Sequence, residues 1–221
     1  GGAGAFNPEP LAAFFDLFLI GDAEEAVVEL LAAWRALKRK ADITDKRKLL
    51  ASLAKSVKGI YAPGLYRAAA DARARFRRIR PRDPGLPDRI EARRFSDLGR
   101  SKIDKPIVPL IETVHDRAVV EIMRGCPRSC RFCQASWINC PVRRKSPDEV
   151  KRQALFLADE TGYGEVSLLS LSSGDYPGLS RLCGEISSPL ADRNVNLSLP
   201  SLNINPLKEE MEYIDSIKED V

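Results

Sequence analysis

The chain has 221 residues, of which 44% are hydrophobic and 30% charged, with a net charge of +4. This composition is ordinary for a globular protein and excludes wholesale disorder, and the charge alone is too small to indicate a nucleic-acid-binding protein. No apolar run reaches the roughly 18–20 residues of a membrane span, so we expect no membrane partner. Three of the five cysteines lie within eight positions, which predicts a metal in a reducing, cytoplasmic compartment.

Residues 1–40 are predicted to be the C-terminal part of an α/β domain. Residues 14–20 (FFDLFLI) have the composition of a short buried strand, and apolar residues from Val27 to Leu37 repeat with a helical spacing. Because the sequence has no initiator Met, we expect that it is a piece of a longer protein.

Residues 41–112 are predicted to be a helical and β connector. A second helix is expected over 45–57, and a hairpin within 66–95 around Asp83-Pro84-Gly85. A strip of arginines marks this hairpin, namely Arg73, Arg75, Arg77, Arg78, Arg80 and Arg82, continued by Arg89, Arg93 and Arg94. Such a strip either binds phosphates or is an ordinary solvated surface, and the sequence leaves both open.

Residues 113–221 show a regular β/α alternation. Strands are predicted over 118–123, 166–171 and 195–199. Helices are predicted from Ser146 as N-cap to Gly162, over 179–191, and from Pro206 onward. Three successive repeats predict an α/β fold, the N-terminal half of a (β/α) barrel with parallel strands.

A cysteine-rich loop follows the first of these strands. Cys126, Cys130 and Cys133 have the spacing C-x3-C-x2-C, which suits three corners of a 4Fe–4S cluster and leaves the fourth iron open to a small molecule. Three nearby arginines are expected to offset the thiolate charge, namely Arg124, Arg128 and Arg131. No catalytic side chain is predicted beyond the cluster.

The alternative is a zinc site in which Cys140 or His115 supplies a fourth ligand, or three cysteines without a metal. His115 precedes the first strand, away from the expected site, so a structural or surface role is favoured. Cys140 is expected to be a partly buried free thiol, and Cys183 to lie in the core.

The cysteine spacing, with Phe132 just before the third cysteine, resembles the radical S-adenosylmethionine (SAM) superfamily. A branch with an N-terminal cobalamin-binding-like domain is more similar still. That branch is related to methyltransferases and methylthiotransferases acting on RNA, proteins or small molecules. The segments that carry this likeness are 1–2, 6–10, 21–25, 115–117, 124–126, 130–135, 141–143 and 168–176.

The resemblance implies an enzyme whose 4Fe–4S cluster, reduced by a protein such as flavodoxin or ferredoxin, cleaves SAM to a 5′-deoxyadenosyl radical. Its substrate is unknown. The residues implied to bind SAM are Phe132, Ser172, Ser173, Gly174, Asp175 and Ser198. The four from Ser172 to Asp175 resemble a variant of the family's Gly-Gly-Glu, with an ordinary βα turn as the alternative. For Ser198 and Pro200-Ser201, a simple strand end is the alternative.

Three features depart from this family. Gly21-Asp22-Ala23-Glu24 stands where Gly-Glu-Gly-Glu is common. The chain supplies about three of six β/α units, and it lacks the Asp-x-His-x-x-Gly loop that ligates cobalt, so cobalamin is possible only in a longer protein. Two other functions stay open: a nucleic-acid-binding module with a structural, Cys-ligated metal, and an inactive fragment.

Overall fold

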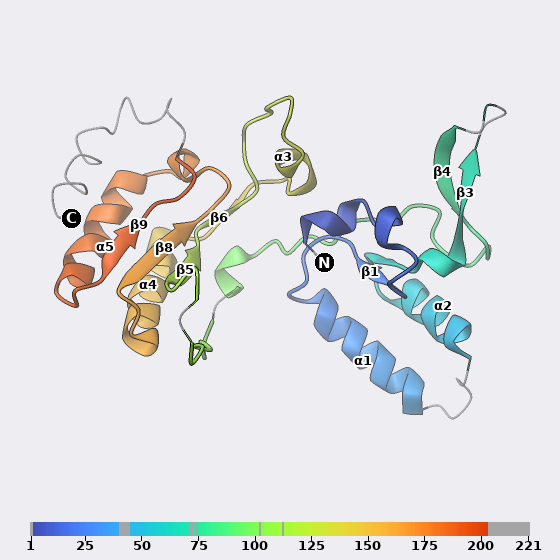
Figure 1. Cartoon of the computed structure of the whole chain (residues 1–221), viewed down its shortest axis with the longest axis horizontal. Coiled ribbons are helices and arrows are strands. Elements are labelled where there is room, and N and C mark those ends of the chain that lie inside the picture. The colour runs from blue at the N-terminus through green and yellow to red at the C-terminus, as the bar shows by residue number, and fades with distance from the viewer. Residues whose placement is uncertain are drawn as a thin grey trace. The chain divides into compact units, whose positions relative to one another are not determined.

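A computed structural model describes residues 2–39, 45–70, 73, 75–101, 103–111 and 113–202 (Figure 1). The chain divides into two compact units, Gly1–Phe95 and Ser96–Val221, and the division falls within the predicted connector. Across the described ranges, no helix is both long and apolar enough to cross a membrane.

The first unit contains two short sheets and two helices. Its strands are β1 (Phe18–Leu19), β2 (Ile60–Tyr61), β3 (Tyr66–Ala70) and β4 (Phe76–Pro81). Its helices are α1 (Ala26–Arg39) and α2 (Lys46–Ser56), with 3-10 turns η1 (Ala3–Phe6), η2 (Glu9–Leu11) and η3 (Pro63–Leu65). Both predicted helices are therefore confirmed, and the strand predicted over 14–20 is present only as the two residues of β1.

The chain at residues 93–95 is joined to the end of β1. Arg93 N–H donates to Ile20 O at 2.8 Å, and Phe95 N–H donates to the Asp22 carboxylate at 2.8 Å. Gly21 has φ +99°, and a Cβ there would lie 2.2 Å from Arg93 O. Only glycine allows the two segments to approach this closely.

The predicted hairpin is present, but its turn was placed wrongly. β3 pairs antiparallel with β4, so the chain reverses between residues 70 and 76 rather than at Asp83-Pro84-Gly85. Residues 83–86 form a separate turn, closed by Leu86 N–H donating to Asp83 O at 3.1 Å. Ile79 then packs against the core of this unit, which fixes the register of β4.

The second unit is a parallel sheet with two covering helices. The sheet order is β5 (Ala118–Glu121), β8 (Glu165–Leu169), β9 (Asn196–Ser198), with all pairs parallel. The helices are α4 (Pro147–Thr161) and α5 (Leu179–Ala191). Smaller elements are η4 (Leu98–Arg100), β6 (Met123–Arg124), α3 (Ala135–Ile138), β7 (Arg143–Arg144) and η5 (Ser173–Asp175).

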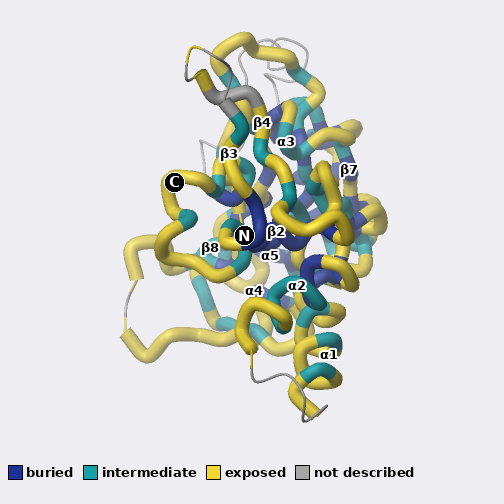
Figure 2. Tube along the Cα trace, turned by 90° about the vertical axis from the view of Figure 1, so that its right-hand side faces the viewer, coloured by how far each residue is buried: buried dark blue, intermediate teal, exposed yellow. Residues whose placement is uncertain are grey.

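Local signals fix the ends of α4 as predicted. Ser146 Oγ accepts the Glu149 N–H at 3.3 Å, Pro147 occupies the first turn, and Gly162 ends the helix with φ +68°. Apolar residues at helical spacing, among them Val150, Ala154 and Leu157, are buried against the sheet and α5. Figure 2 shows buried stretches of the chain in dark blue and exposed ones in yellow.

Helices α4 and α5 pack on the sheet, and the outward side chains of alternate residues are left partly open. Val120 and Leu168 are fully buried, whereas their neighbours Val119 and Leu169 are 39% and 46% exposed. Over the described range 113–202, the strands form an open sheet and not a closed barrel. The helix predicted from Pro206 lies outside the described residues.

Candidate functional site

The three clustered cysteines stand on one loop, residues 125–142, which we call the cysteine loop. Its two ends are paired as β6 and β7, with Arg124 opposite Arg143. Lys145 N–H donates to Ile122 O at 2.9 Å and continues this pairing by one step. The loop is therefore closed at its base by backbone hydrogen bonds.

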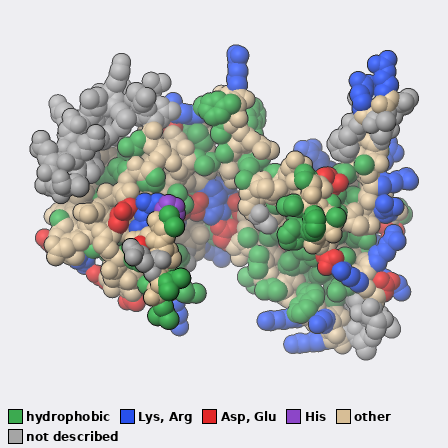
Figure 3. All heavy atoms as spheres, in the orientation of Figure 1, with side chains coloured by type: hydrophobic (Ala, Val, Ile, Leu, Met, Phe, Trp, Pro, Cys, Tyr) green, Lys and Arg blue, Asp and Glu red, His purple; other side chains and the backbone are tan. Residues whose placement is uncertain are grey.

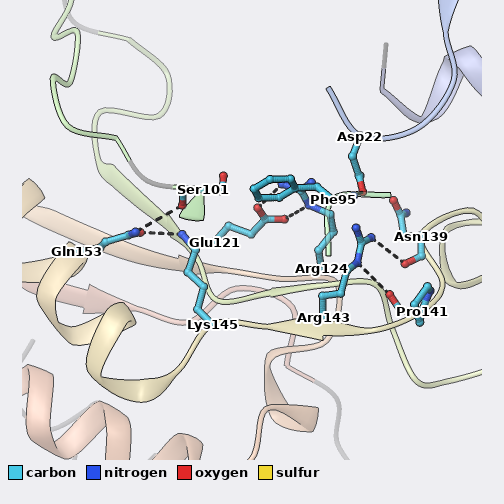
Figure 4. Close-up of polar contacts among 10 residues, drawn as sticks. All are labelled: Asp22, Phe95, Ser101, Glu121, Arg124, Asn139, Pro141, Arg143, Lys145 and Gln153. Carbon is cyan, nitrogen blue, oxygen red and sulfur yellow. Dashed lines mark hydrogen bonds and ion pairs between the residues drawn. The ribbon is translucent and has the colours of Figure 1, made fainter. Parts of the chain in front are cut away.

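Two residues tighten this base, Gly125 and Arg143. Gly125 has φ +91°, and a Cβ there would lie 2.7 Å from Asn139 O, so the loop ends touch only because position 125 is glycine. The Arg143 guanidinium is buried and donates to Pro141 O at 3.2 Å and to Asn139 O at 3.4 Å (Figure 4). Arg143 thus holds the returning end of the loop by its carbonyls.

The predicted ligands lie at the surface of this loop. Cys126 and Cys133 are half-buried, Cys130 is exposed, and all three are free thiols. Cys133 N–H donates to Cys130 O at 3.0 Å, and this turn keeps the two residues close in space. Within the part of the chain that the structure describes, no three His, Cys, Asp or Glu side chains are gathered as a metal-binding group.

Phe132 and Trp137 also project from the cysteine loop, with exposures of 92% and 70%. Large aromatic side chains this exposed contribute nothing to the core of the unit. They offer apolar surface to a ligand or partner.

An ion pair joins the cysteine loop to the loop after β8. Arg128 Nε and Nη2 donate to the two Asp175 carboxylate oxygens at 2.7 and 2.9 Å, and Ser172 Oγ donates to Asp175 Oδ2 at 2.7 Å. These hydrogen bonds lower the pKa of the Asp175 carboxyl and raise that of the Arg128 guanidinium. Cys126 and Cys130 raise the pKa of Arg128 further, so both thiols lie within electrostatic reach of it.

The loop after β8 is in turn fastened to the loop after β9. Ser173 is fully buried, its N–H donates to Ser201 O at 3.1 Å, and its hydroxyl donates to Pro200 O at 2.8 Å. The structure therefore brings together the predicted SAM-binding residues 172–175 and the segment Pro200-Ser201. Ser198 is half-buried inside β9, paired with Ser167.

The other arginines assigned to the cysteine loop have different roles. Arg124 donates to Glu121 through two hydrogen bonds of 2.8 and 2.7 Å, so its charge is already balanced (Figure 4). Arg131 is exposed at the surface. Arg128 is the one of the three that is paired with the loop after β8.

A buried polar group supports the loop from below, and sequence reasoning missed it. Lys145 is 5% exposed, its ammonium donates to Gln153 Oε1 at 2.7 Å, and burial lowers its pKa. The Tyr176 hydroxyl donates to Lys145 O at 2.7 Å, which links the β8 loop to β7. No local sequence signal indicates this contact, because the two residues are 31 positions apart.

The remaining candidates lie elsewhere. His115 is exposed before the start of β5, 3.4 Å from Arg117 Nη2, and Cys183 is fully buried in α5, as predicted. Cys140 is exposed rather than partly buried, because it lies at the turn where the cysteine loop runs back toward β7.

The donor set fits an iron–sulfur cluster better than zinc. Thiolates are the ligands that such clusters use, and Cys126, Cys130 and Cys133 offer three of them on one loop. A closed structural zinc site needs a fourth ligand, whereas an iron–sulfur cluster held by three thiolates leaves one iron open.

Comparison with known proteins gives two family matches. Residues 120–220 match the radical SAM superfamily, and residues 1–63 match the N-terminal region of radical SAM proteins. The second match lies in the unit that ends at Phe95, and the first contains the cysteine loop.

Individual relatives agree with these matches. An uncharacterized protein of Methanocaldococcus jannaschii is 27% identical over 206 residues, which cover 91% of this chain and 36% of that protein. The threonylcarbamoyladenosine tRNA methylthiotransferase of Bacillus subtilis is 38% identical over 64 residues, 29% of this chain and 14% of the enzyme. The tRNA-2-methylthio-N(6)-dimethylallyladenosine synthase of Pseudomonas fluorescens is 29% identical over 101 residues, which cover 43% of this chain and 23% of that enzyme.

The chain thus spans about a third of the length of the archaeal relative and less of the two bacterial enzymes. The match over residues 120–220 covers the cysteine loop, β8 with its loop, and α5. Over this region the chain is similar to the radical SAM superfamily.

Proposed function

We propose that Cys126, Cys130 and Cys133 hold a 4Fe–4S cluster and that the chain is part of a radical SAM enzyme. The observation that carries the proposal is the closed cysteine loop, which carries Cys126, Cys130 and Cys133 within eight positions, with Cys140 as a fourth thiol seven residues further on. The cluster, when bound, supplies the electron for reductive cleavage of SAM. The chain's own residues position the loop and shield it.

The SAM contacts in this proposal come from the cysteine loop and the loop after β8. The exposed ring of Phe132 offers a stacking surface for adenine. The polar residues from Ser172 to Asp175 lie at the carboxyl end of β8, where ligands of α/β folds bind, and Arg128 connects them to the cysteines.

The barrel also belongs to this proposal. One sector of a (β/α) barrel is expected to have parallel strands with a helix in each connection. It is also expected to have a sheet face that is partly exposed, as Val119 and Leu169 are. Cobalamin is left out, because residues 1–95 contain no histidine to ligate cobalt.

The substrate of this enzyme is a separate question. The two bacterial relatives are named as tRNA-modifying enzymes, and RNA is therefore the substrate class that we propose. A carrier protein such as flavodoxin or ferredoxin is the expected electron donor.

The test is oxygen-free reconstitution of the chain with iron and sulfide, followed by metal analysis and addition of SAM with a chemical reductant. We expect about four irons per chain, as in Cys-ligated cubane clusters, and formation of 5′-deoxyadenosine. Cys133→Ala is expected to lose the iron, whereas Cys140→Ala, on the same loop, keeps it. One tightly bound zinc, or iron that survives Cys133→Ala, would overturn the proposal.

A further inference from the structure

The β3–β4 hairpin has two chemically different faces. Residues directly opposite each other in an antiparallel pair share a face, and successive residues alternate between faces. Arg67 lies opposite Arg80, and Ala69 lies opposite Arg78, so the three arginines share one face. We call Arg67, Arg78 and Arg80 the arginine face.

The opposite face is bound to the core of the first unit. Tyr66 is 3% exposed and donates its hydroxyl hydrogen to Pro87 O at 3.1 Å, and Ile79 packs against the core cluster. This attachment leaves the arginine face toward solvent, and all three of its side chains are exposed. Figure 3 shows Lys and Arg side chains gathered along the hairpin.

The arginine face carries uncompensated charge. Like charges directly opposite each other across a strand pair are destabilising, yet Arg67 and Arg80 occupy such a pair. None of the three arginines has an ion-pair or hydrogen-bond partner among the residues that the structure describes. An arrangement that costs stability in the free protein becomes favourable when an anion lies across it.

Other arginines of the predicted strip are occupied within the fold. Arg93 donates to the Glu29 carboxylate at 2.9 and 2.7 Å, which attaches residues 93–95 to α1. Arg82 donates to Tyr66 O at 2.9 Å, and Arg94 lies over the ring of Phe6 at 5.9 Å. Within the strip, Arg82, Arg93 and Arg94 are thus engaged in the fold, whereas Arg78 and Arg80 belong to the arginine face.

A pocket of about 870 Å³ reaches the arginine face at Arg78, the member of that face that lines it. Arg78 and Ile79 of β4 line it together with the rings of Phe6 and Tyr61. Rings and aliphatic side chains next to a cationic track are the elements that single-stranded nucleic acids use, because an unstacked base can enter the pocket while its phosphates contact the arginines.

Carboxylates complete the pocket and favour RNA over DNA. Asp88 and Glu91 are among its lining residues. A carboxylate accepts hydrogen bonds, and the ribose 2′-hydroxyl is a donor that DNA lacks.

We propose that the arginine face and its pocket bind single-stranded RNA, with phosphates on Arg67, Arg78 and Arg80 and one unstacked base in the pocket. Binding requires no cluster and is independent of the cysteine loop. That this RNA is the substrate of the enzyme rests on the proposed function.

The test measures binding of a fluorescently labelled single-stranded RNA of about 12 nucleotides, within the range of single-strand binding sites, to the metal-free chain over a series of KCl concentrations. Three phosphate contacts predict a slope of about −2 in log K against log salt. The triple variant Arg67→Gln, Arg78→Gln, Arg80→Gln is expected to lose about 2 units of slope and about 10- to 100-fold in affinity. Arg78→Glu, a single charge reversal beside the pocket, should also weaken binding.

The matched control removes three exposed positive charges from the helices of the same unit, Arg35→Gln, Arg39→Gln and Lys48→Gln, and should change affinity less than threefold, as expected for general attraction. Because the arginine face is exposed and self-repelling, its triple variant should melt no lower than the wild type. An equal loss in the control, or equal affinity for the same DNA sequence, an RNA duplex or polyglutamate, would overturn the proposal. These outcomes leave iron loading unaffected, so they are distinguishable from failure of the proposed function.

Discussion

Arg128 and Asp175 connect the cysteine loop to the loop after β8 through two hydrogen bonds of 2.7 and 2.9 Å. Ser172 supplies a third hydrogen bond to the same carboxylate. Asp175 is therefore engaged within the chain, and its partner stands between two of the cysteines in sequence. We infer that this pair sets the position of the cysteine loop over the end of β8.

The first prediction tests this positioning role. Arg128→Met and Asp175→Asn are each expected to lower iron–sulfur retention about 10- to 100-fold, the loss typical when groups that orient metal ligands are removed. The exchanged pair, Arg128→Asp with Asp175→Arg, should recover much of it. Retention is measured as iron per chain after gel filtration without oxygen.

The control for that experiment is another bidentate ion pair in the same unit, Arg193 with Asp159. Arg193→Met should leave iron retention unchanged, because this pair joins α4 to the chain after α5. A positioning role is contradicted if the exchanged pair is as poor as the single variants.

The second prediction concerns pH. The Arg128 hydrogen bonds, with Ser172 and the charge of Arg144, lower the pKa of Asp175 below the value of about 3.9 in unfolded chains. A depressed folded pKa stabilises the protein above the unfolded pKa, and this stabilisation is lost as pH falls through the folded pKa. The melting temperatures of wild type and Asp175→Asn should differ by a constant amount above about pH 5 and converge in stronger acid. A difference that widens on acidification would contradict this assignment.

The third prediction concerns the base of the cysteine loop. Gly125→Ala requires left-handed backbone and places a Cβ 2.7 Å from Asn139 O. Gly162→Ala is the matched control, because it has φ +68° and no atom within 4 Å of its Cβ. The control should lower the free energy of unfolding by about 1–2 kcal/mol. Gly125→Ala should lower it by more, and urea titration measures both. Equal costs would mean that the contact with Asn139 is not a constraint.

The fourth prediction concerns the buried hydroxyl of Tyr176. Tyr176→Phe leaves Lys145 O without this donor and should cost about 1–3 kcal/mol. Tyr163→Phe serves as the control, since the Tyr163 hydroxyl has no hydrogen-bond partner among the described residues of this unit. The free energy of unfolding of both variants is measured by urea titration. A similar decrease in the two would mean that the Tyr176 hydrogen bond does not stabilise the unit.

The fifth prediction separates ligand binding from stability. Because Phe132 is 92% exposed, Phe132→Ala should leave the melting temperature unchanged. Loss of a stacking contact with adenine, worth about 1–3 kcal/mol per base, should weaken SAM binding to the cluster-loaded chain about tenfold. Trp137→Ala, on the same loop, is the comparison, and an equal effect would argue against a specific role for Phe132.

Much of the second unit could be predicted from local sequence. Ser146, Pro147 and Gly162 mark the ends of α4, and a nearly continuous apolar run marks β8, because a strand in a covered parallel sheet is apolar on both faces. The cysteine spacing indicated the loop, although not how its side chains lie.

The contacts that position the loop could not be predicted, since they depend on residues distant in sequence. Arg128 and Asp175 are 47 positions apart. Nothing in the local sequence distinguishes the buried Arg143 from an arginine on the surface. The hairpin turn was misplaced because residues 71–75 (DARAR) contain no Gly, Pro or Asn, whereas Asp83-Pro84-Gly85 has the stronger turn signature.

The pairing of β6 with β7 has a thermodynamic consequence for cofactor assembly. It brings together the ends of an 18-residue segment, from Gly125 to Val142, through backbone hydrogen bonds that involve no metal ligand. Bringing together the ends of a flexible segment of that length costs about 2.5 kcal/mol in chain entropy, by the logarithmic loop-closure relation. Because this entropy is lost when the second unit folds, forming the iron–thiolate bonds has to offset only the ordering of the three cysteines.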